Sequence, residues 1–266
     1  MVVDLAELQE TQQELQYGKG DGTDRSRSID EISEMIGFFV LDSDFPGISS
    51  GIKGLLERYI AEKGHVVWAD FGCGNAFALR QGKMHLESVS IDPDKLKAYG
   101  VDVLPVVDEE VAHTIDYFKR RDGLDFDNIM DAKYAPVLIS DDITTVRLPE
   151  RPDIVTCCEV LMWAYDPLMA FANAASQAEI GATLGFNRLN NILVKTRFDT
   201  MGHQGNLFRH IITENSGFPG FQIYDECYAL DELLLKKTSE QDFTYGFKKL
   251  NDAKAYQGIT HVYVKK

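Results

Sequence analysis

A short run of acidic and glycine residues is the first feature of this sequence that suits binding chemistry. Residues 70–75 read Asp-Phe-Gly-Cys-Gly-Asn and directly follow an apolar segment at residues 66–69. Glycine permits a tight turn and lets a ligand approach the backbone closely. A helix that begins after such a turn offers free backbone N–H groups to a carboxylate. The run therefore predicts a ligand-binding loop.

Two acidic segments follow at intervals that suit a nucleoside. Asp92 lies 92 − 70 = 22 positions after Asp70. An acidic side chain about 20 residues beyond a glycine loop is placed to accept hydrogen bonds from a ribose diol. Asp141, Asp142 and Ile143 follow a third apolar segment, where a carboxylate and a neighbouring backbone N–H complement an adenine edge. Together the three segments predict a nucleoside-binding crevice.

The elements that position these residues alternate as in a parallel α/β sheet. The expected strands lie at residues 66–69, 87–91, 136–140, 153–158 and 182–186. In this interpretation the second strand ends at Asp92 and Pro93, which places Asp92 beside the glycine loop. An aspartate before a proline is also typical of a helix N-cap, and the two interpretations are compatible.

The rest of the chain is expected to form one domain over residues 1–266. An N-terminal helical cap occupies residues 1–64, a cofactor-binding core residues 65–186 and a substrate-side region residues 187–266. Three helices are expected in the cap, at residues 4–16, 29–40 and 48–62, the last ending near Gly64. A helical insertion is expected at residues 101–135, and a final hairpin at residues 243–250 and 260–264.

The order of these segments resembles motifs I to IV of the class I, Rossmann-like methyltransferases that use S-adenosylmethionine. The matching segments read DFGCGN, SIDPD, SDDI and PDIVTCCEVL, within residues 66–186. The resemblance implies a doubly wound, mostly parallel seven-stranded sheet with helices on both faces. It also implies S-adenosylmethionine as cofactor, S-adenosylhomocysteine as product, and direct in-line displacement of the methyl group.

The same resemblance implies a cofactor site drawn from all four segments. Its residues are Asp70, Gly72, Cys73, Gly74, Asn75, Asp92, Pro93, Asp141, Asp142, Ile143, Cys158 and Glu159. The glycines and Cys73 would pass under the methionine moiety, and Asp92 would take both ribose hydroxyls. Asp142 would bind the adenine amino group, Ile143 would contact the ring, and Cys158 and Glu159 would close the pocket.

The residues that serve the methyl acceptor are expected elsewhere. A hydroxyl or amine acceptor loses a proton as it attacks, so a positioned base helps. His203 and His210 are the candidates, because they lie seven positions apart just beyond the fifth expected strand. Trp163 and Tyr165 are candidates to wall the acceptor, and Tyr17, ahead of a glycine-rich hinge, is a candidate contact from the cap.

The amino-acid composition limits the classes of molecule that this chain is expected to bind. Lys and Arg total 27 against 42 Asp and Glu, a formal net charge of −15, which repels phosphate backbones. We therefore expect a small-molecule acceptor undergoing O- or N-methylation and no nucleic acid. Four cysteines without a CxxC pair favour reduced thiols in the cytoplasm and no structural metal. The apolar runs are too short for a membrane span, and no signal peptide is expected.

Three alternatives remain open at this stage. The first is a noncatalytic binder of S-adenosylmethionine, and the second is a methyltransferase acting on protein or tRNA. The third is a dehydrogenase, which usually carries another glycine shortly after Gly74, whereas Asn75, Ala76 and Phe77 follow here. Base-modifying DNA enzymes are disfavoured, because neither adjacent cysteine follows a proline and no Asn-Pro-Pro-Tyr segment is present.

Overall fold

The computed structural model describes a defined part of the chain. These residues are 5–6, 9–10, 27–36, 51–123, 126, 128–158, 160, 170, 173–174, 176–179, 182–186, 243–248 and 260–265. Its strands are β1 Val66–Phe71, β2 Leu96–Asp102, β3 Val137–Ser140, β4 Ile154–Cys157, β5 Thr183–Phe186, β6 Phe243–Lys248 and β7 Thr260–Lys265. Its helices are α2 Ile29–Ile36, α3 Gly51–Lys63, α4 Phe77–Ser88 and α5 Asp108–Asp122, with short 3-10 turns η3 Pro93–Lys95 and η4 Ala132–Tyr134.

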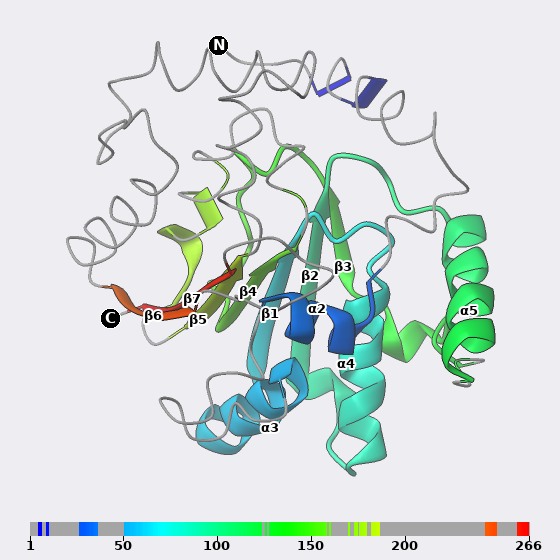
Figure 1. Cartoon of the computed structure of the whole chain (residues 1–266), viewed down its shortest axis with the longest axis horizontal. Helices are drawn as coiled ribbons and strands as arrows, with labels where there is room; N and C mark the ends of the chain where they lie inside the picture. Colours follow the sequence, from blue (N-terminus) through cyan, green and yellow to red (C-terminus); the bar gives the residue numbers. More distant parts are fainter. Residues whose placement is uncertain are drawn as a thin grey trace.

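These strands form one sheet in the order β3-β2-β1-β4-β5-β7-β6, drawn edge to edge in Figure 1. Strands β1 to β5 pair in parallel, and β7 joins β5 antiparallel as half of a hairpin with β6. The predicted parallel α/β sheet and the final hairpin are therefore confirmed. The strand order reverses between β1 and β4, and ligands of such sheets bind at this switch point, outside the carboxyl ends.

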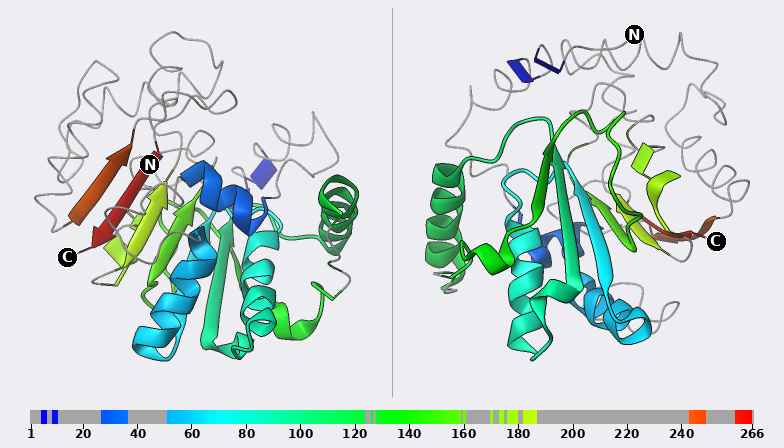
Figure 2. Two further views of the ribbon diagram at one scale, coloured as in Figure 1. Left: turned by 60° about the horizontal axis from the view of Figure 1, so that its bottom comes forward. Right: turned by 180° about the vertical axis from the view of Figure 1, so that it is seen from behind.

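Helices α2, α3 and α4 pack together over one face of the sheet (Figure 2). Their apolar residues enclose Trp68 of β1, which is fully buried. Gly82 of α4 allows this close approach, because a Cβ there would lie 2.9 Å from Cζ3 of Trp68. Burial of this helix–sheet contact stabilises β1 and therefore the loop that follows it.

The expected second strand at residues 87–91 is wrong. Helix α4 continues to Ser88, and the second strand of the sheet is β2, which begins at Leu96. The sequence Glu-Ser-Val-Ser-Ile at residues 87–91 alternates like a strand, but its first two residues complete the last turn of the helix.

The expected helical insertion is also reinterpreted. Because β2 ends at Asp102, helix α5 is the crossover that connects β2 to its parallel neighbour β3. Phe118 of α5 stacks on Phe77 of α4 with ring centroids 4.8 Å apart, so the crossover helix packs beside the helix that follows the glycine loop. Residues 101–135 thus hold the end of β2 and an ordinary crossover.

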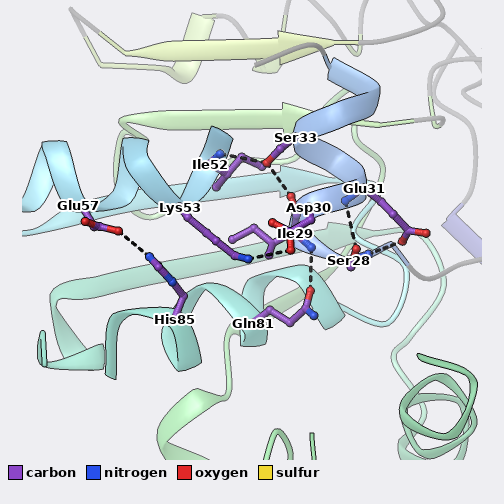
Figure 3. Close-up of polar contacts among 10 residues, drawn as sticks. All are labelled: Ser28, Ile29, Asp30, Glu31, Ser33, Ile52, Lys53, Glu57, Gln81 and His85. Carbon is purple, nitrogen blue, oxygen red and sulfur yellow. Dashed lines mark hydrogen bonds and ion pairs between the residues drawn. The ribbon is translucent and has the colours of Figure 1, made fainter. Parts of the chain in front are cut away.

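Helix α2 begins with a capping box and is fixed to both neighbouring helices (Figure 3). The backbone N–H of Glu31 donates to Oγ of Ser28, and the N–H of Ser28 donates to Oε2 of Glu31. The N–H of Ile29 donates to Oε1 of Gln81 in α4 at 2.7 Å, and the N–H of Ile52 in α3 donates to Oγ of Ser33 at 3.0 Å. The N-terminal helices are therefore an integral part of the core.

Two further features of the described residues complete the fold. The left-handed end expected at Gly64 is confirmed, with φ +82° and an N–H that donates to the carbonyl of Ile60. None of the helices within the described ranges combines the length and apolar character that a bilayer span requires.

Candidate functional site

The glycine loop lies where the carboxyl ends of β1 and β2 meet. Gly72 and Gly74 adopt positive φ, as does Ala76, the N-cap residue of helix α4, which makes no side-chain capping bond. The N–H groups of Gly72 and Cys73 donate to the carbonyl of Val101 at 2.6 and 3.1 Å. The loop is therefore held against β2, and the first turn of α4 points its N–H groups toward this edge.

Asp102 is the acidic residue that the sheet brings to this loop. Its Oδ2 accepts from the N–H of Gly74 at 2.8 Å, and its Oδ1 accepts from the N–H of Leu104 at 3.0 Å. Its carbonyl accepts from the N–H of Asp141, which follows β3. One residue thus joins the ends of three neighbouring strands.

Asp92 and Pro93 lie at the opposite end of β2, which corrects the expected ribose site. Asp92 caps the turn η3, and its Oδ1 accepts from the N–H of Asp94 at 3.0 Å. At about 3.3 Å per residue, the strand between Leu96 and Asp102 separates Asp92 from the loop by roughly 20 Å. The interpretation of Asp92 as an N-cap is the one that the structure supports, and the acidic end of the second strand is Asp102.

Asp70 is a buried acid at the end of β1. Its Oδ1 accepts from Oγ1 of Thr156 in β4 at 2.6 Å, and Thr156 accepts from Nε1 of Trp68 at 2.9 Å. Burial and, to a smaller extent, the negative charge of Asp102 raise the pKa of Asp70 to about 7, although the bond from Thr156 lowers it. The charged neighbour of this acid is therefore another acid.

The three cysteines at the site, Cys73, Cys157 and Cys158, are buried free thiols. Cys73 packs its Sγ against Gly100 of β2, where a Cβ would lie 2.8 Å from the sulfur. Burial, and then the charge of Asp70, raise the pKa of Cys157 well above that of an ordinary thiol. Because the thiolate is the reactive form, Cys157 is not suited to act as a nucleophile. Cys158 is buried in the main apolar core.

Asn75 fastens the loop to the crossover helix. Its side chain is fully buried, with Nδ2 donating to Oγ1 of Thr114 in α5 at 2.6 Å and Oδ1 accepting from the N–H of Phe77 at 3.3 Å. Its amide is therefore engaged by the protein, which makes Asn75 a support of the loop.

The acidic pair after β3 forms a turn. Oδ1 of Asp141 accepts from the N–H of Asp142, and both carboxylate oxygens of Asp142 accept from Thr144, at 2.9 Å from its N–H and 2.7 Å from its hydroxyl. Ile143 is buried at this turn. A carboxylate has about four acceptor positions, so Asp142 can still accept a bond from an adenine amino group. Adenine recognition by Asp142 stays a prediction.

Gln9 is a contact at this edge that the sequence did not indicate. Its Nε2 donates to the carbonyl of Val103 at 2.9 Å and to Oγ of Ser140 at 3.2 Å. The described piece of the N-terminal segment therefore lies above the carboxyl ends of β2 and β3 (Figure 1). The two partners are 94 and 131 positions away, so no local pattern announces the contact.

Several predicted site residues lie outside the described part of the chain. They are Tyr17, Glu159, Trp163, Tyr165, His203 and His210. Their roles toward cofactor and acceptor stay predictions. Within the described residues, no three His, Cys, Asp or Glu side chains are grouped as a metal ion requires.

No protein-family model matches the sequence, and no curated protein matches it significantly. Magnesium protoporphyrin IX methyltransferase from Synechocystis PCC 6803, solved with bound S-adenosylhomocysteine, is 15% identical with a TM-score of 0.47, covering 99% of this chain and 100% of its own. The N-methyltransferase NodS from Bradyrhizobium japonicum is 14% identical with a TM-score of 0.41, covering 92% and 99%. An rRNA methylase from Streptococcus thermophilus is 12% identical with a TM-score of 0.40, covering 80% and 95%. Because each TM-score is below 0.5, these likenesses do not establish what the chain binds or does.

Proposed function

We propose that this chain is an S-adenosylmethionine-dependent methyltransferase that acts on a small-molecule acceptor. The observation that carries the proposal is the pair of acids at the glycine loop. Asp102 binds the loop through the N–H of Gly74, and Asp70 lies buried at the end of the preceding strand. The edge of the sheet at its switch point is therefore acidic.

Acidic side chains at this edge of the sheet select among nucleoside cofactors. S-adenosylmethionine carries a sulfonium and an ammonium group, whereas a dinucleotide carries a pyrophosphate with two negative charges. Two carboxylates attract the cations and repel the pyrophosphate. This charge favours S-adenosylmethionine over NAD, in agreement with the missing third glycine of the loop.

The chain's own groups suit the remaining parts of this cofactor. The N–H groups in the first turn of α4 suit its carboxylate. Asp102, at the end of the second strand, suits the ribose diol in place of Asp92. The bound cofactor would supply an electrophilic methyl group to an acceptor oxygen or nitrogen.

The net charge of the chain supports a small molecule as the methyl acceptor. The chain has a formal net charge of −15, which disfavours association with a phosphate backbone. We keep His203 and His210 as the candidate bases that take the acceptor's proton, and Trp163 and Tyr165 as candidate acceptor contacts.

Isothermal titration calorimetry with S-adenosylmethionine and NAD tests the cofactor. We expect binding of the first only, and Asp102→Ala should weaken it by about 5- to 150-fold, or ~1–3 kcal/mol, because charge-assisted hydrogen bonds are lost. Asp92→Ala is the matched control and should leave the affinity unchanged. Binding of NAD alone, or equal losses in the two variants, would contradict the proposal.

Release of S-adenosylhomocysteine with a panel of small hydroxyl and amine compounds tests the activity. Turnover with one of them supports methyl transfer to a small molecule. Turnover with bulk tRNA or protein instead would assign another acceptor class, and cofactor binding without any turnover would indicate a noncatalytic binder.

A further inference from the structure

We propose that Thr156 is a positioning residue that holds the Asp70 carboxylate ionised toward a cationic ligand at the glycine loop. The inference rests on the proposed function, because it deepens how that same site binds its cofactor. It assigns a role to a strand residue that does not belong to the glycine loop or to the acidic segments.

The three side chains of this network share one face of the sheet. Trp68 and Asp70 are two positions apart on β1, and Thr156 of β4 is paired directly with Asp70 in the parallel register. Each is nine-tenths or more buried. The bonds run from Nε1 of Trp68 to Oγ1 of Thr156 and from Thr156 to Oδ1 of Asp70.

The direction of these bonds favours the ionised acid. The indole N–H of Trp68 is a donor only, so it occupies an acceptor position of the Thr156 oxygen. The single hydroxyl proton of Thr156 is then directed to Asp70, which accepts it best as a carboxylate. A protonated Asp70 could still accept this bond through its carbonyl oxygen, but a neutral acceptor binds the hydroxyl proton more weakly than a carboxylate does.

Burial and one neighbouring charge oppose ionisation. Burial is the larger cause, and Asp102 adds negative charge from β2. Together, and against the bond from Thr156, they raise the pKa of Asp70 to about 7, so Asp70 titrates where a modest change in its surroundings alters its charge. Thr156 is the described side chain that counteracts them.

This arrangement predicts pH-dependent cofactor binding. A cation binds the ionised site, so affinity for S-adenosylmethionine should be constant above pH ~8 and fall about tenfold per pH unit below pH ~7. Methylthioadenosine, which has neither the sulfonium nor the amino-acid part, should bind with a flat profile.

Calorimetric titrations from pH 5.5 to 8.5 with both ligands test this. Thr156→Val removes the hydroxyl and should move the midpoint for S-adenosylmethionine to higher pH, while Thr156→Ser should keep it within about 0.3 pH units of wild type. Thr183→Val is the matched control, since it removes another buried hydroxyl, bonded to Tyr59, at the amino-terminal end of β5, away from the glycine loop. Its midpoint should not move.

The outcomes separate the two proposals. No binding of S-adenosylmethionine at any pH would end the proposed function and this inference with it. Binding with a flat wild-type profile, or with equal midpoints in wild type and Thr156→Val, would overturn the inference alone. If Thr156→Val does not fold, the wild-type profile and the comparison of the two ligands still decide.

Discussion

Two glycines of this chain share a left-handed backbone but differ in what surrounds them. Gly72 has φ +77° and Gly64 has φ +82°. A Cβ on Gly72 would overlap the side chain of Val160, whereas a Cβ on Gly64 would have no heavy atom within 4 Å. At position 72, both the left-handed backbone and the side chain of Val160 therefore require glycine. At position 64, only the left-handed backbone does.

Substitution of these glycines separates the two requirements. Gly64→Ala should lower the free energy of unfolding by about 1 kcal/mol, the cost of a left-handed alanine. Gly72→Ala should cost about 2–4 kcal/mol, because overlap with Val160 adds to the backbone term. Urea unfolding measures both.

A second variant identifies the partner of Gly72. Adding Val160→Ala to Gly72→Ala should recover part of the loss, as a double-mutant cycle between contacting residues does. Equal losses for Gly72→Ala and Gly64→Ala, or no recovery in the double variant, would show that Val160 does not restrict this position.

At the scale of elements, local sequence patterns predicted the structures that form without distant contacts. Strand β1, the glycine turn and helix α4 were predicted from sequence, because an apolar β-branched run followed by glycines determines that unit without distant contacts. Strand β2 was missed, because alternation at residues 87–91 resembles a strand more closely than Lys97 and Gly100 allow within β2.

The site itself depends on pairing across the sheet. Asp102 reaches the loop because Asp70 pairs with Gly100 in the β1–β2 register. Thr156 reaches Asp70 across 86 positions. Such registers arise from packing, so the sequence indicated the kind of site but placed its second acid at the wrong end of the strand.

Helix α2 offers a prediction at the same scale. Ser28→Ala removes the acceptor for the N–H of Glu31 and should lower the free energy of unfolding by ~1 kcal/mol. Amide hydrogen exchange should be faster in α2, which is bonded to α3 and α4 at its buried face (Figure 3). Ser88→Ala is the control, because that exposed hydroxyl bonds a carbonyl at the end of α4, and it should change little. Equal effects would exclude a capping role for Ser28.

At the scale of the whole molecule, the pH dependence of stability is the sum of contributions from 42 acidic residues. Most of these contributions are shared by wild type and any single variant. Asp70 stands apart because it is fully enclosed in the core beneath the loop. Its pKa rises from 3.8 to about 7 on folding, since burial disfavours the charged form. The folded chain therefore binds a proton here that the unfolded chain has released.

The sign of this contribution is opposite to that of a salt-bridged acid. The stabilisation is fully present below pH ~4 and is lost as the pH rises to about 7, the folded pKa. A difference of about three pH units corresponds to at most ~4 kcal/mol. Asp70→Asn stays neutral and keeps an acceptor for Thr156, so relative to wild type it should gain stability progressively between pH ~4 and about pH 7.

Denaturant unfolding of wild type and Asp70→Asn at several pH values measures that gain, because the shared background of the other acids cancels in the difference. The stabilised Asp70→Asn variant should at the same time bind S-adenosylmethionine more weakly. The buried charge of Asp70 lowers the stability of the protein but attracts the cationic cofactor. A difference that is flat with pH would mean that Asp70 titrates in the folded protein as it does in the unfolded chain, so that burial would not raise its pKa.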